Sequence, residues 1–260
     1  MERGDRRESP EILKSLSGIS AGSDFPAPFF VLRGGGGAGR IISSSEYMEV
    51  SVTETKTETK VRVEHPMELR VPKAAFAVDD DDWLFEFCRM NDELRIERTA
   101  EGTLEIEMPT GGETSDRNSE INMQLRLWAK RDGAGVAFES SGGFVLPNGA
   151  LRAPDASWVE RDRLSNLTAG QKRRFLPLCP DFAIEFRSPS DPFPKIEAKM
   201  REYIENGAKL GWLLDPEERR AYVYKSDGSA ELLENPESLS GDPELPGFTL
   251  TLKPVWEPEF

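Results

Sequence analysis

Histidine and cysteine are scarce in this sequence, and each shortage excludes a class of protein. The chain has one histidine, His65, and two cysteines, Cys88 and Cys179, among 260 residues. A single histidine excludes zinc sites built on several histidines and argues against Ser–His–Asp and Cys–His catalytic arrangements. His65 precedes Pro66 in a peripheral segment, where we expect an ordinary surface histidine. The two cysteines are too few for a disulfide framework and are expected to be buried free thiols.

Long apolar runs and positive charge are also in short supply. No run approaches the roughly 20 apolar residues of a membrane helix, and the Arg- and Glu-rich start lacks the apolar core of a signal peptide. We therefore expect a cytoplasmic protein with no membrane partner. The 33 Lys and Arg face 47 Asp and Glu, which gives a net charge of −14 and argues against broad, non-specific binding to nucleic acid. A bound metal and a local basic patch can reverse that field at one site.

The chain divides by composition into three stretches. Residues 1–58 show no sustained helical or strand period and predict a disordered N-terminal extension. Met48 is a sensible start codon, so residues 1–47 are candidates for a wrongly assigned start. Residues 59–73 alternate weakly and predict a peripheral edge segment, and residues 74–260 predict one α/β domain.

Within that domain, spacing predicts a mixed β-sheet flanked by helices, with added β-hairpins. Helical periods cover residues 79–90, 114–131 and 194–206. Alternating segments predict hairpins at 94–108 and at 136–146, the second across Ser141-Gly142. Further strands are predicted at 155–159, 181–187, 210–215, 221–225, 230–233 and 247–252.

Two acidic strands and a nearby lysine form the constellation most suited to chemistry. Asp155 begins one predicted strand, and period two places Asp181, Glu185 and Arg187 on one face of another. Buried carboxylates need a partner or a metal, and Mg²⁺ prefers such hard oxygen ligands. Helix spacing places Lys199 at the border of the packing face of the helix over 194–206, where its stem can reach the sheet. Such a lysine can position or activate a water molecule, and Arg187 is a candidate stabiliser of a pentacovalent phosphate.

This series of motifs resembles the PD-(D/E)XK nuclease superfamily, and most closely its Uma-type branch of restriction-endonuclease-like bacterial proteins. The resemblance covers about residues 74–260, and the matching segments are LRIERT (94–99), PTGGE (109–113), RNSEI (117–121), PNG (147–149), PDASW (154–158), CPDF (179–182), EFRSPS (185–190) and the stretch from 199 to 212. The resemblance implies a restriction-endonuclease-like α/β fold and Mg²⁺- or Mn²⁺-dependent cleavage of DNA. A homodimer is a further expectation, because nucleases of this fold often pair to cut two strands.

The resemblance also assigns residues. Asp155 matches the metal-binding aspartate and Glu185 matches the (D/E) of the second element. Arg187 stands where the superfamily's lysine usually falls, so Lys199 is the candidate for its displaced equivalent. Glu120 is either an additional metal-linked carboxylate or a solvent-facing glutamate. Asp181 is either an accessory ligand or a strand-start partner for Arg187.

Two alternatives to a nuclease remain open at this point. A catalytically inactive binding or scaffold protein of the same fold is favoured by Arg187 in the lysine position and by the negative net charge. A glycosidase with a carboxylate pair fits the two acids alone, but it explains neither the neighbouring Arg and Lys nor the small sheet.

Overall fold

The computed structural model describes the backbone of five strands between residues 32 and 72, the backbone of residues 81 and 82, and residues 83–92, 94–107, 109–188 and 191–258 with their side chains. The chain divides into two compact units, one of Met1–Ile96 with Thr103–Ile106 and the other of Glu97–Gly102 with Glu107–Phe260. Along the sequence, the two units meet near residue 97, and the predicted start of the α/β domain at residue 74 stays a prediction. His65 lies outside the described residues.

The first unit contains a five-stranded antiparallel sheet. Its strands follow chain order: β1 (Leu32–Arg33), β2 (Gly39–Ile42), β3 (Tyr47–Glu54), β4 (Glu58–Val63) and β5 (Glu68–Pro72). Strands β1 to β3 and the first residue of β4 fall within residues 1–58, where the sequence predicts disorder, and that division of the chain stays a prediction. In β3 and β4, Val52 pairs with Val61 and Val50 with Val63. The valines alternate with polar residues at period two, and the abundance of Thr, Glu and Lys concealed that signal.

Helix α1 (Asp81–Met90) completes the description of the first unit. It buries Leu84 and Phe87, and the side chain of Asn91 donates a hydrogen bond to the Phe87 carbonyl at the C-terminal end of the helix. The predicted helix is thus present. Cys88, by contrast, is only half-buried, whereas Cys179 in the second unit is buried, and neither forms a disulfide among the described residues. The expected hairpin follows, with β6 (Arg95–Arg98) beside β7 (Leu104–Glu107).

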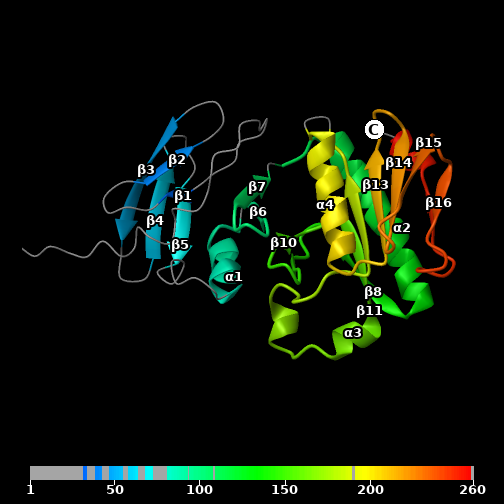
Figure 1. Ribbon diagram of the computed structural model, residues 1–260, viewed down its shortest axis with the longest axis horizontal. Helices are drawn as coiled ribbons and strands as arrows, with labels where there is room; N and C mark the ends of the chain where they lie inside the picture. Colours follow the sequence, from blue (N-terminus) through cyan, green and yellow to red (C-terminus); the bar gives the residue numbers. More distant parts are fainter. Residues whose placement is uncertain are drawn as a thin grey trace, which may run out of the picture. The chain divides into compact units, whose positions relative to one another are not determined.

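A six-stranded mixed sheet forms the centre of the second unit (Figure 1). Its order is β15 (Ala230–Glu234), β14 (Arg220–Lys225), β13 (Leu210–Asp215), β12 (Phe182–Phe186), β11 (Ala156–Glu160) and β8 (Gly135–Glu139). Only β12 and β13 are parallel. Helix α4 (Phe193–Glu205) connects them, as a parallel pair requires a crossover.

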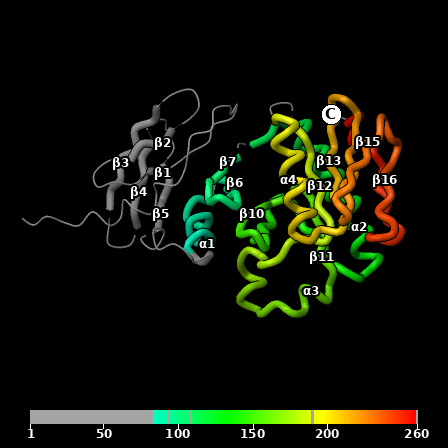
Figure 2. Tube along the Cα trace, viewed as in Figure 1, coloured from blue at the N-terminus to red at the C-terminus, as the bar shows by residue number. Residues whose placement is uncertain are grey.

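Two helices cover the two faces of this sheet (Figure 2). Helix α2 (Gly112–Asp132) packs Ile121, Leu125 and Trp128 against the face that carries Phe182 and Ile184. Helix α4 packs Ile196, Met200 and Tyr203 against the face that carries Ala183 and Leu213. Alternation along β12 therefore sends Glu185 to the α4 face, because Glu185 is two residues from Ala183.

The C-terminal segment closes the core on the α2 side. A two-stranded sheet of β16 (Ser238–Ser240) and β17 (Thr249–Thr251) is followed by the short helix α5 (Lys253–Trp256). Phe248 stacks on Trp212 with ring centroids 5.6 Å apart and an interplanar angle of 14°. This aromatic contact fixes the segment on the centre of the sheet. Among the described helices, none is both long and apolar enough to cross a bilayer.

The predicted hairpin over 136–146 is wrong. Strand β8 pairs with β11, whereas β9 (Phe144–Val145) pairs with β10 (Leu151–Arg152), so the two segments belong to different sheets. The chain leaves β8 at the turn around Ser141-Gly142, and Gly143 then lies so close to Phe175 that a Cβ would sit 2.4 Å from its ring. Arg98 of β6 also pairs with Leu151 of β10.

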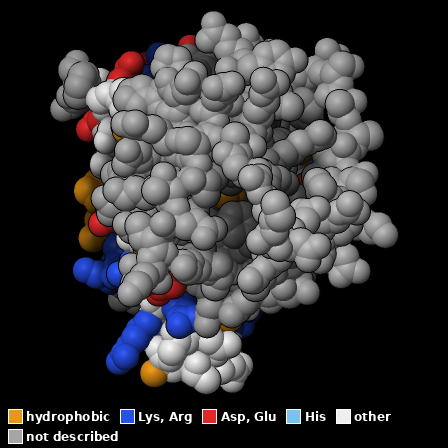
Figure 3. Space-filling model, turned by 90° about the vertical axis from the view of Figure 1, so that its left-hand side faces the viewer, with side chains coloured by type: hydrophobic (Ala, Val, Ile, Leu, Met, Phe, Trp, Pro, Cys, Tyr) orange, Lys and Arg blue, Asp and Glu red, His pale blue; other side chains and the backbone are white. Residues whose placement is uncertain are grey.

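A basic segment follows β11. It contains helix α3 (Arg161–Ser165) and the 3₁₀ turn η3 (Gln171–Arg173), and it forms the lowest part of the ribbon in Figure 1. Lys and Arg side chains are visible at the same height in Figure 3. The sequence 161–174 has one carboxylate, Asp162, against five cations: Arg161, Arg163, Lys172, Arg173 and Arg174.

The close approach of Gly135 to Trp158 gives a test of the sheet packing. A Cβ on Gly135 would lie 2.2 to 2.4 Å from indole atoms of the buried Trp158. We expect Gly135→Ala to lower the free energy of unfolding by about 1–3 kcal/mol through overpacking, measured by urea denaturation. In the control Gly170→Ala, the nearest atom is 3.8 Å away and φ is −66°, so the change should stay within about 0.5 kcal/mol. Equal stabilities of the two variants would contradict this packing.

Candidate functional site

Asp155 lies immediately before β11 and is held from two sides. Its Oδ2 accepts a hydrogen bond from the Phe186 amide at 2.9 Å, and its Oδ1 lies 3.4 Å from Asn118 Nδ2. Asn122, one turn further along α2, donates to the main-chain oxygen of Asp155 at 2.8 Å. Because Phe186 directly follows Glu185, these contacts fix the carboxyl group of Asp155 beside the end of β12.

Glu185 is buried on the α4 side of β12. Its Oε1 accepts a hydrogen bond from the Tyr203 hydroxyl at 2.8 Å and lies 3.0 Å from Lys199 Nζ. Burial, together with the negative charges of Asp155 and Glu97, raises the pKa of Glu185 to about 8 against the opposing effect of Lys199. The negative charges of Asp155 and Glu97 beside Glu185 favour a cation at this point, and a bound cation would in turn favour the ionised form of Glu185.

Lys199 reaches the sheet from α4, as the helical spacing predicts. Its ammonium group lies 2.9 Å from Glu97 Oε1 and 3.0 Å from Glu185 Oε1. Burial alone would lower the pKa of Lys199, but the two carboxylates outweigh burial and raise it above its usual value. Lys199 is therefore a cation at neutral pH, so it can donate hydrogen bonds but cannot accept a proton.

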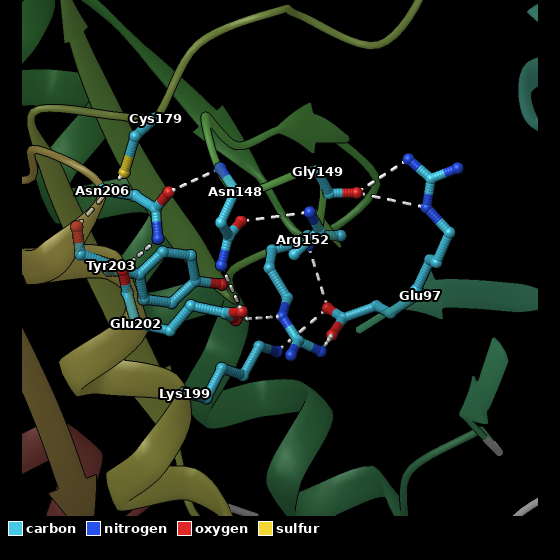
Figure 4. A network of polar contacts seen from close by, with 12 residues as sticks. Glu97, Asn148, Gly149, Arg152, Cys179, Lys199, Glu202, Tyr203 and Asn206 are labelled. Carbon is cyan, nitrogen blue, oxygen red and sulfur yellow. Dashed lines mark hydrogen bonds and ion pairs between the residues drawn. The ribbon is translucent and has the colours of Figure 1, made fainter. Parts of the chain in front are cut away.

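Glu97 is a buried member of the site that sequence reasoning missed. Its Oε1 accepts hydrogen bonds from Lys199 and from the Ala153 amide, and its Oε2 lies 3.2 Å from Arg152 Nη1 (Figure 4). Burial opposes its ionisation, yet Lys199 and Arg152 lower the pKa of Glu97 to about 2. Strand alternation offered no signal, because Ile96 and Glu97 are adjacent and both are buried.

The contacts continue from Arg152 to the C-terminal end of α4. Arg152 Nε donates to Glu202 Oε2 at 2.6 Å, and Asn148 Nδ2 donates to Glu202 Oε1 at 2.9 Å. The Asn148 amide also donates to Asn206 Oδ1 at 2.9 Å (Figure 4). The segment Pro147-Asn148-Gly149 of the family-like motifs therefore connects the start of β10 to α4.

Arg187 belongs to a different cluster. Its Nη1 lies 2.5 Å from Asp215 Oδ2, and its Nε donates to the Asp191 carbonyl at 3.2 Å. The parallel register that places Phe186 beside Leu214 brings Asp215 alongside Arg187. The pairing of Arg187 with Asp181, one of the two alternatives for Asp181, is therefore not seen: Arg187 pairs with Asp215.

Asp181 lies at the other end of β12 from Glu185. It makes ion pairs with Arg163 at 3.0 Å and with Lys209 at 3.1 Å, and its Oδ2 accepts a hydrogen bond from the Glu160 amide. Four residues of strand separate it from Glu185, about 13 Å at the usual rise. The structure thus does not bring Asp181 to the metal-binding end as an accessory ligand.

Helix α2 presents amides, not Glu120, to Asp155. Glu120 Oε1 accepts a hydrogen bond from Gln124 at 2.8 Å, and Gln124 also bonds the main chain of Thr251. Asn118 and Asn122 occupy the face toward Asp155, and at 100° per residue Glu120 lies about 200° from Asn118. Glu120 is half-buried, and its two expected roles stay predictions.

The described residues fit a metal held by few protein ligands. Within them, no three His, Cys, Asp or Glu side chains converge as a metal site. Asp155 and Glu185 supply two carboxylates. This number suits Mg²⁺, which is commonly bound by one or two carboxylates with waters and substrate oxygens. The side-chain oxygen of Asn118, beside Asp155, is buried and has no hydrogen-bond partner in the described part of the chain. An unsatisfied acceptor beside the carboxylate of Asp155 is compatible with a cation.

A family model described as "Uma2: Putative restriction endonuclease" matches residues 81–253, which is more than half of the chain. The chain belongs to the Uma2 family. None of the curated proteins compared with it matches.

A solved structure has a fold similar to that of a large part of the chain. It is the crystal structure of a "putative nuclease belonging to DUF820" from Anabaena variabilis ATCC 29413. The TM-score is 0.54 at 22% sequence identity, and the match covers 63% of this chain and 90% of the other. The expected restriction-endonuclease-like α/β fold is thereby confirmed.

The pKa of Glu97 predicts how acid affects stability. Because the pKa is lowered on folding, ionised Glu97 contributes stability above pH about 4.5, and this contribution is lost as the pH falls toward 2. At 1.36 kcal/mol per pKa unit, wild type should lose up to about 3 kcal/mol more than Glu97→Gln over that range. Urea denaturation at a series of pH values measures the difference.

The control for this prediction is Glu205→Gln, which changes an exposed glutamate near the end of α4. It should follow the wild-type pH dependence. Parallel curves for wild type and Glu97→Gln would show that Glu97 is not ionised in a buried ion pair.

Proposed function

We propose that this Uma2 protein is a metal-dependent endonuclease that hydrolyses phosphodiester bonds of DNA. The observation that carries the proposal is the pair of buried carboxylates, Asp155 and Glu185, with the ammonium group of Lys199 3.0 Å from Glu185. The family description and the descriptions of the matching fold support the same reaction class.

Each side chain has a role that its contacts support. Asp155 and Glu185 would hold Mg²⁺ or Mn²⁺, which when bound acts as a Lewis acid on the phosphate and lowers the pKa of water. Tyr203 donates to Glu185 and fixes the orientation of its carboxyl group. Lys199, as a cation, would position the attacking water or a phosphate oxygen and stabilise developing negative charge.

Arg187 and the oligomeric state remain predictions. Contact of Arg187 with a phosphate would require its guanidinium group to leave Asp215. Pairing of two copies would supply two sites for the two strands of a duplex, and sedimentation of the purified protein measures it. A cytoplasmic location likewise stays a prediction.

The basic segment 161–174 supports a nucleic-acid substrate. Arg161, Lys172 and Arg173 are exposed, and in the described part of the chain the guanidinium of Arg161 bonds main-chain carbonyls rather than carboxylates. Phosphate contacts by Lys and Arg supply most of the affinity of proteins for DNA. This segment offers such contacts on a chain whose net charge is −14.

Plasmid cleavage tests the proposed reaction. Supercoiled plasmid, linear duplex and single-stranded DNA are incubated with the protein and Mg²⁺ or Mn²⁺, with a chelator as the metal-free control. We expect cleavage that the chelator abolishes, and losses of at least about 100-fold in Asp155→Asn, Glu185→Gln and Lys199→Met. The matched control Glu205→Gln should retain the wild-type rate.

The same experiment separates the nuclease from a non-catalytic scaffold. A folded wild-type chain that cleaves none of the three substrates with either metal would favour the scaffold. Wild-type rates in Asp155→Asn or Glu185→Gln would refute the assignment of the site. Circular dichroism of each variant establishes that a lost rate is not a lost fold.

A further inference from the structure

The side-chain oxygen of Asn118 is a buried acceptor without a partner. The atom is shielded from solvent, and no described residue donates a hydrogen bond to it. An unsatisfied buried polar atom costs about 1–3 kcal/mol. Rotating the amide would not help, because it would turn the oxygen toward Asp155 Oδ1, which now lies 3.4 Å from Asn118 Nδ2. The position therefore requires a donor or a cation that the described residues do not provide.

Asn118 differs in chemistry from the other unsatisfied buried groups. Three of those are nitrogen donors, which cannot bind a cation, and Asp181 Oδ1 has ion pairs with Arg163 and Lys209. The remaining one is the hydroxyl of Ser157, which is both donor and acceptor. Among the unsatisfied atoms of the described residues, Asn118 Oδ1 is the one neutral atom that can only accept.

The position of this oxygen matches what the metal site lacks. Fewer than three acidic, histidine or cysteine side chains converge at any point of the described chain. A site of Asp155 and Glu185 therefore needs further oxygens from amides, main-chain carbonyls, waters or substrate. Amide oxygens of Asn are accepted ligands of hard divalent cations, and they add no negative charge beside buried carboxylates.

We propose that Asn118 binds the divalent cation of this site directly, through Oδ1, as a third side-chain ligand beside Asp155 and Glu185. The proposal rests on the metal-dependent function proposed above. In this arrangement α2 has two tasks: Asn122 holds the main chain of Asp155, and Asn118 supplies a ligand oxygen while its Nδ2 faces the Asp155 carboxylate.

Calorimetric titration of the full chain with MnCl₂ and MgCl₂ gives the first test. Asn118→Leu has a side chain of similar size without oxygen, and we expect it to weaken Mn²⁺ binding at least about tenfold. Asn118→Asp keeps an oxygen at the same position and should retain binding. Thermal unfolding followed by circular dichroism checks that both variants fold.

A cysteine substitution gives a readout that does not depend on affinity or on activity. A thiolate prefers softer metals, so Asn118→Cys should lose Mg²⁺ binding and gain Cd²⁺ binding, with the ultraviolet absorption of a cadmium–thiolate bond. Asn122→Cys is the matched control, because it adds one thiol to the same face of α2 next to Asp155. Wild type supplies the background from Cys88 and Cys179. We expect the absorption in Asn118→Cys only.

The outcomes distinguish the two proposals. If wild type binds Mn²⁺ and Asn118→Leu binds it equally well, or if the two cysteine variants absorb alike, the assignment of Asn118 fails, its oxygen holds only a water molecule, and the metal-dependent function stands. If wild type binds neither cation at millimolar concentration, the metal-dependent function and the role of Asn118 both fail.

Discussion

The ammonium group of Lys199 lies between two buried carboxylates, and the arrangement of the site depends on that contact. Glu97 and Glu185 come from β6 and β12, and without a cation between them their burial would be strongly unfavourable. Arg152 supplies the second positive charge beside Glu97. Removing one partner from such a group leaves an uncompensated buried charge, which is why these side chains constrain one another so tightly.

The central strands explain how residues so far apart in sequence meet. The crossover through α4 between the parallel strands β12 and β13 brings Lys199 and Tyr203 over Glu185. The antiparallel register of β11, with Ala156 opposite Ile184, brings Asp155 to the Phe186 amide. The cores on the two sides of the sheet hold α2 and α4 in place. Burial of these apolar faces offsets the cost of the polar site between them.

Periodicity in the sequence was sufficient to predict the positions of some site residues, but not of others. Strand alternation separated Glu185 from its apolar neighbours, and helix spacing singled out Lys199. Glu97 and Lys199 are 102 residues apart, and Asn118 and Asp155 are 37 apart. Those contacts depend on which strands pair with one another. The local pattern of the sequence does not specify this long-range pairing. The same limit explains why Asp215, which comes from the neighbouring strand, was not predicted as the partner of Arg187, and it explains the wrong hairpin after β8.

The hydrogen bonds of Asn148 reduce the conformational freedom of Lys199 in the folded chain. Asn148 bonds both Glu202 and Asn206, so the C-terminal turns of α4 are attached to the loop before β10 as well as to the sheet. Sliding or rotating α4 would break these bonds together with those of Lys199 and Tyr203. The lysine is therefore immobilised when the chain folds, and a substrate need not order its long side chain on binding. Conformational freedom that is already lost in the free protein does not weaken the complex.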